Sequence, residues 1–254
     1  MQETSDRLAT GTIDDAEVER FARLAETWWD PVGKFRALHR INPVRLAFLR
    51  DRLAVHFGRD IRAPRPFAGL RLLDIGCGGG LVSEPMARLG FAVTGIDAGT
   101  ETLAVARAHA AESGLVIDYR QAAAEDLAAA GESFDAVLTL EIVEHVADPE
   151  LFLAAAASLL RPGGAFAAAT INRTPKAFLL AVVGAEYVLR WLPPGTHHWN
   201  RFVRPSELAG GLRPHGIAVA ELRGITYDPL RDEWSLSGDL DVNYLLFGAK
   251  AAVQ

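Results

Sequence analysis

A run of glycines in the first half of the chain contains the first residues able to bind a ligand. Residues 72–75 form an apolar stretch that includes Asp74, and four glycines follow within five positions. Glycine permits a sharp turn and leaves no Cβ where a ligand approaches the backbone. The pattern predicts a strand, a tight turn at Gly76 and Gly78, and a helix beginning near Gly80, with a ligand at the turn.

The spacing of these glycines separates two classes of ligand. In the dinucleotide fingerprint G-x-G-x-x-G, the third glycine lets the helix pack closely on the strand. Counted from Gly76 and Gly78, that position is Leu81. Asp74 lies just before the turn, where a carboxylate repels a pyrophosphate but not a cationic or zwitterionic nucleoside. The turn therefore favours S-adenosylmethionine over a dinucleotide.

Acidic residues follow the next two predicted strands. Asp97 lies 21 positions after Gly76, where a carboxylate can accept hydrogen bonds from both hydroxyls of an adenosine ribose. The alternative is that Asp97 is the N-cap of the next helix. Ala124 and Glu125, in an acidic loop with Asp126, are placed to contact the adenine edge, or else the loop is simply solvated.

A second candidate site follows the fourth predicted strand, at the carboxyl edge where open sheets bind ligands. If residues 139–146 are helical, Glu141, Glu144 and His145 share one face. Such a face could hold a divalent cation, Mg²⁺ or Mn²⁺ rather than zinc. His145 could instead be a general base near neutral pH, or residues 144–145 could only cap the turn. The residues leave these three alternatives open.

The segment 176–192 is too apolar for an ordinary surface helix and too short to span a bilayer. Its Lys at the start and Arg-Trp near the end suit an interfacial helix on an anionic lipid surface. The alternative is a lid helix packed on the core. Both fit a lipid-like substrate. His197 and His198 follow on a polar loop, where they either line the substrate pocket or are exposed by chance.

Alternating strands and helices must position these residues. The predicted strands are 71–75, 92–96, 116–120, 134–138 and 165–170, and the helices between them are 80–89, 101–113 and 149–160. This alternation predicts an α/β fold with a doubly wound, parallel sheet. Around this core we expect helices at 14–29, 43–57 (opened by Asn42-Pro43), 177–192 and 204–213, a linker at 59–69, and strands at 217–225 and 242–248.

Composition limits the class of protein. The 254 residues are 50% hydrophobic and 23% charged, which is enough for a large core. The net charge of −6 argues against a nucleic-acid partner. Cys77 is the one cysteine, so a disulfide framework and a Cys-type zinc site are excluded. A polar N-terminus and the lack of an apolar run long enough to span a membrane predict a cytoplasmic protein.

Two levels of resemblance follow from these motifs. Residues 74–80, Asp97, 133–137 and 160–164 resemble the successive motifs of class I S-adenosylmethionine-dependent methyltransferases. Nearly the whole chain resembles the ubiquinone biosynthesis O-methyltransferase family, through segments 28–30, 38–45, 172–173, 182–187, 194–197 and 241–244. That family methylates ring hydroxyls of polyprenylated precursors, namely 2-polyprenyl-6-hydroxyphenol and 3-demethylubiquinol.

The resemblance implies a Rossmann-like sheet, mostly parallel with an antiparallel C-terminal strand, in a single methyltransferase domain over 1–254. Its parts are an N-terminal helical cap and linker (1–69), a cofactor-binding core (70–172), a lid or membrane-contact insertion (173–203) and C-terminal elements (204–254). The implied location is the cytoplasm, with peripheral contact on the inner face of the membrane. Other enzymes of the ubiquinone pathway are implied partners.

Site residues follow from the same resemblance, position by position. It implies that Arg45, Gly76, Asp97 and Leu140 contact S-adenosylmethionine, with Arg45 on the methionine carboxylate. Glu141, Glu144 and His145 match positions given to Mg²⁺ in mitochondrial relatives, whereas residues 198–200 depart from the family pattern. The full set of predicted cofactor-binding residues is Arg45, Asp74, Gly76, Gly78, Asp97, Ala124, Glu125 and Leu140, and the predicted catalytic residues are Glu141 and His145.

The chemistry itself makes two demands. Methyl transfer from a sulfonium is an in-line displacement, so the protein mainly aligns the acceptor oxygen with the methyl carbon. A phenol with a pKa near 10 also has to lose its proton, either to His145 or through a metal on the catechol oxygens. We expect Glu141→Ala to lose activity while still binding S-adenosylmethionine. The alternative functions are a quinone C-methyltransferase, a non-catalytic S-adenosylmethionine-binding subunit at the membrane, and a dinucleotide oxidoreductase.

Overall fold

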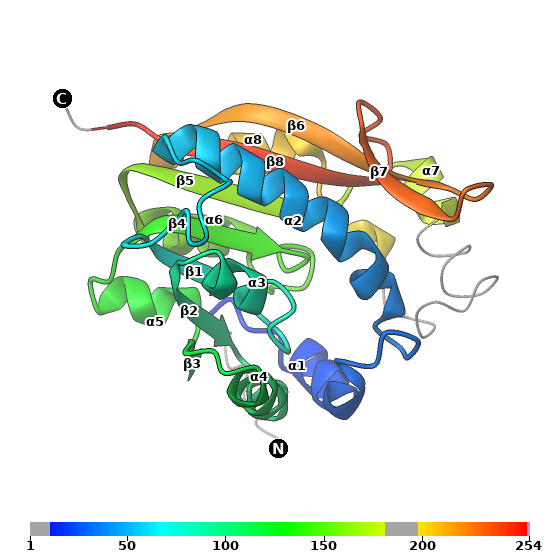
Figure 1. Ribbon diagram of the computed structural model, residues 1–254. Coiled ribbons are helices and arrows are strands. Elements are labelled where there is room, and N and C mark those ends of the chain that lie inside the picture. The colour runs from blue at the N-terminus through cyan, green and yellow to red at the C-terminus, as the bar shows by residue number, and fades with distance from the viewer. Residues whose placement is uncertain (1–10, 181–197, 253–254) are drawn as a thin grey trace, which may run out of the picture.

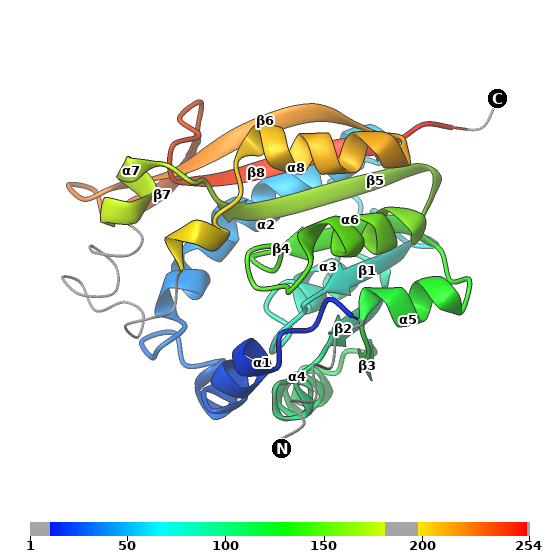
Figure 2. The same cartoon turned by 180° about the vertical axis from the view of Figure 1, so that it is seen from behind.

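A computed structural model of the protein describes residues 11–180 and 198–252. Within this part of the chain, one sheet of eight strands runs in the order β3-β2-β1-β4-β5-β8-β6-β7, as Figure 1 shows. Helix α2 covers one face of the sheet, and α5, α6 and α8 cover the other, which is in front in Figure 2. The predicted α/β fold with a doubly wound sheet is confirmed.

The parallel half of the sheet consists of five strands: β1 (Arg71–Ile75), β2 (Ala92–Asp97), β3 (Asp118–Gln121), β4 (Phe134–Leu140) and β5 (Leu160–Ile171). The intervening helices are α3 (Ser83–Arg88), α4 (Thr100–Glu112), α5 (Ala124–Ala129) and α6 (Pro149–Ser158). Every residue of β4 is buried, as expected for a strand covered on both faces. The strand order reverses between β1 and β4, and a crevice forms at the carboxyl ends of the strands there.

The other half of the sheet is antiparallel. β8 (Asn243–Lys250) pairs with β5 and with β6 (Ile217–Asp228), and β7 (Glu233–Ser237) completes the edge. The antiparallel C-terminal strand expected from the family is therefore confirmed. β7 was not predicted, because its residues are mostly exposed and carry no apolar run. β5 begins at Leu160, five residues before the predicted strand 165–170, so the stretch between that strand and the predicted helix 149–160 already belongs to the sheet.

The N-terminal helices differ from the prediction. The expected helix 14–29 is divided into α1 (Asp15–Ala22) and the short η1 (Ala25–Thr27). α2 (Arg36–Phe57) begins before Asn42, so Pro43 lies inside the helix instead of opening it. A proline removes one backbone hydrogen bond, but the buried face of α2, with Phe48 and Leu49, packs on the sheet. Tertiary packing thus outweighs the local signal.

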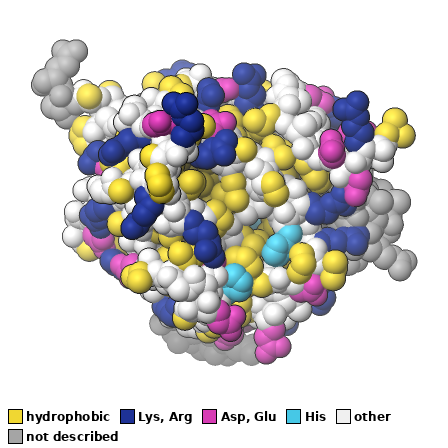
Figure 3. All heavy atoms as spheres, viewed as in Figure 1, with side chains coloured by type: hydrophobic (Ala, Val, Ile, Leu, Met, Phe, Trp, Pro, Cys, Tyr) yellow, Lys and Arg dark blue, Asp and Glu magenta, His cyan; other side chains and the backbone are white. Residues whose placement is uncertain are grey.

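Two apolar cores flank the sheet. One core joins α2 and α3 to one face, with Leu53, Met86 and Leu138 among its buried residues. The other joins α5, α6 and α8 (Pro205–Leu212) to the opposite face, with Phe152 and Leu208. Basic and acidic side chains are interspersed on the face seen in Figure 3. The sheet is held from both sides, so the carboxyl ends of its strands are fixed in space.

The insertion after β5 is described only at its ends. Residues 175–177 form α7, and Phe178, Leu179 and Leu180 beyond it are exposed. On the far side are the short η3 (Trp199–Arg201) and, after α8, η4 (Arg213–His215). Most of the predicted lid or interfacial helix, together with His197, lies outside the described residues. Across 11–180 and 198–252, no helix combines the length and apolarity that crossing a membrane requires.

Candidate active site

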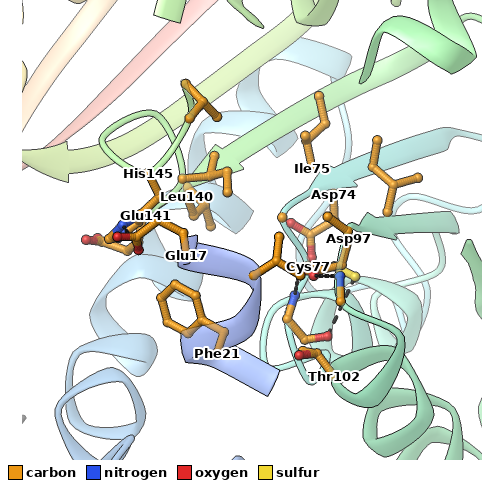
Figure 4. A pocket seen from close by; sticks show the side chains of 18 of the residues that line it. Glu17, Phe21, Asp74, Ile75, Cys77, Asp97, Thr102, Leu140, Glu141 and His145 are labelled. Atoms are coloured by element: carbon orange, nitrogen blue, oxygen red, sulfur yellow. Dashed lines mark hydrogen bonds and ion pairs between the residues drawn. The ribbon is translucent and has the colours of Figure 1, made fainter. Parts of the chain in front are cut away.

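A cavity of about 220 Å³ lies at the carboxyl ends of β1, β2 and β4. Residues of α1 and α2, together with Trp28 between them, complete its wall, so the N-terminal helices cover the crevice of the sheet. Figure 4 shows its two ends. Asp74, Asp97 and Thr102 lie at one, and Glu17, Phe21, Glu141 and His145 lie at the other. Every residue predicted to bind the cofactor lines this cavity except Glu125.

The glycine turn has the backbone that its sequence predicts. Gly76 and Gly78 have φ angles of 71° and 54°, which residues with a side chain rarely adopt. A Cβ on Gly78 would lie 2.1 Å from Cζ2 of Trp28, and one on Gly79 would lie 2.3 Å from Cδ1 of the same ring. Trp29 donates a hydrogen bond from Nε1 to the carbonyl of Gly79 (2.9 Å). The turn is therefore closed against the two tryptophans, a contact that the sequence did not reveal.

Asp97 holds this turn in place through backbone hydrogen bonds. Its carboxylate accepts hydrogen bonds from the backbone N–H groups of Gly78 (3.0 Å) and Gly99 (2.9 Å). Burial raises its pKa, although these N–H groups oppose the effect. Gly99 is the N-cap of α4, so the alternative interpretation of Asp97 as that cap is wrong. Asp97 ends β2 at the cavity, as the ribose hypothesis requires.

Asp74 and Arg45 bring opposite charges to the floor of the cavity. Ser83 donates a hydrogen bond to Asp74 (2.6 Å), and burial raises the pKa of this carboxyl to about 6 against the influence of Ser83 and Arg45. Arg45 comes from α2, with its side chain only 3% exposed. Its Nη1 lies 3.3 Å from Oε1 of Glu141, and its Nε has no hydrogen-bond partner among the described residues. Arg45 thus retains a buried donor at the cavity, suited to a second carboxylate.

The segment after β4 is a turn, so the predicted helical face is wrong. The N–H of Glu141 donates a hydrogen bond to the carbonyl of Ala169 in β5 (2.8 Å). The backbone of Glu141 has a left-handed φ of 54°. Glu144 points into the core and accepts a hydrogen bond from Thr170 Oγ1 (2.8 Å). A helix begins only after Asp148, whose side chain caps α6. The three candidate residues therefore point in different directions.

These directions matter for the predicted metal. Glu141 faces Arg45, Glu144 faces Thr170, and His145 Nδ1 lies 3.0 Å from Oε2 of Glu17. Among the described residues, no three His, Cys, Asp or Glu side chains are grouped so that they could hold a metal ion. The donor set predicted for Mg²⁺ does not fit a metal in this arrangement.

Burial and charge shift the pKa values of Glu144 and Glu17 in opposite directions. Burial raises the pKa of Glu144, and the neighbouring Glu141 adds to this effect. Burial also raises the pKa of Glu17, but the hydrogen bond and charge of His145, with Arg20 and Arg201 nearby, outweigh it, so the pKa of Glu17 lies below its ordinary value. Glu17 could not be identified from the sequence, because nothing in the spacing of α1 links it to His145.

The predicted adenine loop is a helix, α5, and its two candidate residues separate. Ala124 is buried and lines the cavity, as does Leu140. Glu125 accepts hydrogen bonds from the N–H (2.9 Å) and hydroxyl (3.0 Å) of Thr12, so its carboxylate faces the N-terminal segment instead. The prediction that Glu125 contacts the cofactor is not supported by this placement. His198 precedes η3 and is not among the residues lining the cavity.

Comparison with known proteins agrees with the fold and identifies the relatives. Residues 73–168 match the family model described as a methyltransferase domain. The fold is similar to that of magnesium protoporphyrin IX methyltransferase from Synechocystis, determined with bound SAH (TM-score 0.63, 18% identity, 94% of this chain and 100% of that one). It is also similar to the PH0226 protein from Pyrococcus horikoshii (TM-score 0.61, 15% identity, 91% and 98%).

Relatives of much higher identity match nearly the full length. A protein of Paramagnetospirillum magneticum named ubiquinone biosynthesis O-methyltransferase is 59% identical over 94% of this chain and 96% of its own. A protein of Parvibaculum lavamentivorans with the same name is 54% identical over 99% of both. Because identity at this level extends through the N-terminal helices and the C-terminal strands, the chain belongs to the ubiquinone biosynthesis O-methyltransferase family.

Proposed function

We propose that the protein transfers the methyl group of S-adenosylmethionine to ring hydroxyls of polyprenylated precursors of ubiquinone. The acceptors are 2-polyprenyl-6-hydroxyphenol and 3-demethylubiquinol, the substrates implied by the family. The observation that carries the proposal is the two-ended cavity, with a nucleoside-binding turn at one end and His145 at the other. The chain is thus an S-adenosylmethionine-dependent O-methyltransferase and not a quinone C-methyltransferase or a non-catalytic subunit.

In this proposal the cofactor lies along the cavity. Asp97 accepts hydrogen bonds from the ribose hydroxyls, and the backbone at Gly76 and Gly78 passes close to the nucleoside. Arg45 pairs with the methionine carboxylate, for which its buried Nε is a ready donor. Leu140 and Ala124 supply apolar contact. This orientation directs the sulfonium methyl group toward Glu141 and His145.

The transfer is then a single displacement. The phenol oxygen attacks the methyl carbon in line with the sulfur, so an O–CH₃ bond forms as the S–CH₃ bond breaks and S-adenosylhomocysteine leaves. The phenol proton passes to His145, which is suited to accept it near neutral pH. Glu141 contributes by holding Arg45 in place.

The test is transfer of labelled methyl from S-adenosylmethionine to a short-chain polyprenyl catechol by the wild type and by His145→Ala. We expect this variant to lose activity about 100-fold or more with unchanged affinity for S-adenosylhomocysteine. The control is His215→Ala, in η4 and away from the cavity lining. Full activity of His145→Ala would refute the role of His145 as the general base. Absence of turnover by the wild type, despite tight cofactor binding, would refute the proposal that a polyprenyl catechol is the methyl acceptor.

We further propose that the insertion after β5 touches the membrane where these lipid-like acceptors reside. Three consecutive apolar side chains, Phe178, Leu179 and Leu180, are exposed at the end of the described segment. Lys176, expected to meet anionic lipid, pairs instead with Asp239 and Asp241. The apolar side chains therefore provide the main support for this contact.

Liposome flotation tests the membrane contact. The wild type should float with vesicles of phosphatidylcholine and phosphatidylglycerol, and the double variant Phe178→Asp/Leu179→Asp should not. Val116→Asp is the matched control, because Val116 is 96% exposed beside β3 and far along the chain from the insertion. Equal flotation of all three proteins would refute the contact. The family resemblance also implies an association with other enzymes of ubiquinone biosynthesis, and copurification with those enzymes would test it.

A further inference from the structure

Helix α1 contacts His145, the proposed base, although α1 precedes the matched methyltransferase domain in the chain. Oε2 of Glu17 in α1 lies 3.0 Å from Nδ1 of His145, and the two side chains are 12% and 11% exposed. The ring of Phe21, one turn along α1, meets the imidazole edge-on, with centroids 5.5 Å apart at 87°. Figure 4 shows Glu17 and Phe21 beside His145 at one end of the cavity. The imidazole is therefore held by a carboxylate and an aromatic ring of one helix.

Other contacts fix α1 independently of His145. Thr12 accepts a hydrogen bond at its carbonyl from Ala147 N (2.9 Å), and its own N–H donates to Glu125. Asp14 caps α1 and pairs with Arg201 Nη1 (2.8 Å). These contacts anchor the segment before α1 to α5, to the turn after β4 and to η3. The position of Glu17 over His145 is thus set by the surrounding structure.

The pairing has a chemical consequence. A carboxylate at Nδ1 keeps the proton on that nitrogen, so Nε2 becomes the nitrogen with the lone pair. The same carboxylate favours the imidazolium that forms when the ring accepts a proton. Arg20 on α1 also pairs with Glu17 (2.5 Å), and Arg201 faces it from η3. Glu17 therefore remains an anion between cationic groups, suited to orient a base.

We propose that Glu17 is the positioning residue of His145, so that the N-terminal helix completes the base of the methyl-transfer reaction. The inference depends on the proposed function, in which His145 takes the phenol proton. It adds that the base is a dyad whose second member lies outside residues 73–168, the span matched by the methyltransferase domain. An enzyme with the core alone would lack an oriented base.

The experiment compares Glu17→Ala and Glu17→Gln with the wild type. Glu17→Ala should lower kcat about 10- to 100-fold while leaving the Kd of S-adenosylhomocysteine within about twofold of the wild type. Glu17→Gln should lose less, because its amide oxygen can still accept from Nδ1. Glu19→Gln is the matched control on the same helix, since Glu19 is exposed and its ion pair with Arg23 is long (3.9 Å).

The double variants separate a positioning role from a structural one. If Glu17 acts through His145, Glu17→Ala should have no further effect on kcat in a His145→Ala background. An undiminished loss in that background would overturn the proposal, as would full activity of Glu17→Ala. Full activity of His145→Ala alone would instead overturn the proposed base, whatever Glu17 does. If Glu17→Ala fails to fold, Glu17→Gln carries the same comparison.

Discussion

The two ends of the cavity are built in different ways. At the nucleoside end, a continuous stretch from β1 to the start of α4 supplies Asp74, the glycine turn and Asp97, and its key hydrogen bonds join backbone groups to nearby carboxylates. At the reaction end, Glu141, Glu144 and His145 meet partners from α2, β5 and α1. The first end is set by local backbone geometry and the second by pairings that only the tertiary fold creates.

Because local backbone geometry sets the nucleoside end, one added methyl group in the glycine turn should abolish tight cofactor binding there. Gly78→Ala needs an alanine at φ 54° with its Cβ 2.1 Å from the ring of Trp28. We expect the affinity for S-adenosylhomocysteine to fall about 100-fold or more and the free energy of unfolding to fall by about 2–4 kcal/mol, because strain and overpacking add. Calorimetric titration and denaturant unfolding measure the two effects.

Gly114→Ala is the control for strain alone. Gly114 has a φ of 66°, but a Cβ there would meet nothing within 4 Å. It should cost about 1–2 kcal/mol and leave cofactor affinity unchanged. Equal losses of affinity in the two variants would mean that the loss in Gly78→Ala does not arise at the glycine turn itself.

The next largest effect should come from Asp97. Asp97→Asn retains one acceptor for the backbone but removes the charge from the carboxylate that we propose binds the ribose. We expect the Kd of S-adenosylhomocysteine to rise about tenfold or more, since hydrogen bonds to a charged group contribute about 1.5–3 kcal/mol. Asp118→Asn is the control, because Asp118 is exposed on β3 and, among the described residues, bonds to Arg120. An unchanged Kd in Asp97→Asn would contradict the ribose role.

The same difference explains what the sequence could predict. Four glycines and two acids at set spacings have one economical explanation, a turn closed around a nucleoside, and the turn is where it was expected. The contact with Trp28 could not be predicted, because it depends on how η1 returns over the sheet. The core strands were predictable for a related reason: each buried strand is marked by its own apolar run.

The reaction end shows where local reasoning fails. Glu141, Glu144 and His145 have helical spacing, yet the bond between Glu141 and Ala169 extends the pairing of β4 with β5 beyond β4 itself. Pro43 likewise suggested a helix start, which the packing of α2 overrode. Glu17 left no signal at all, because its significance depends on a partner in a distant turn. These features are decided by contacts between distant segments.

A third prediction tests the pairings of the reaction end through stability. Burial and Glu141 raise the pKa of Glu144 above its unfolded value, so the native state binds this proton more tightly than the unfolded chain does. Stability from this group is present at low pH and is lost as pH rises through the folded pKa. Glu144→Gln, which never ionises, should therefore gain on the wild type by about 1–3 kcal/mol between pH 5.5 and 8.5.

Denaturant unfolding at the two pH values measures this gain. Glu19→Gln, an exposed control, should show no change in its difference from the wild type over the same range. If the advantage of Glu144→Gln did not grow between the two pH values, the folded pKa of Glu144 would have to lie no higher than its unfolded value. The carboxylate would then be stabilised by its surroundings, in conflict with its burial beside Glu141.

The smallest expected effect concerns the metal. Because Glu141, Glu144 and His145 each face a separate partner, and no metal-binding group of three occurs among the described residues, the substrate-free protein should not bind Mn²⁺ tightly. Electron paramagnetic resonance of free Mn²⁺ should show no loss of signal on adding the protein at about 100 μM, an affinity well below that of a preformed carboxylate site. Stoichiometric binding that Glu141→Ala abolishes would show that the turn adopts another arrangement in solution. It would also break the contrast between the two ends, since the reaction end would then be organised by a single ion rather than by three separate pairings.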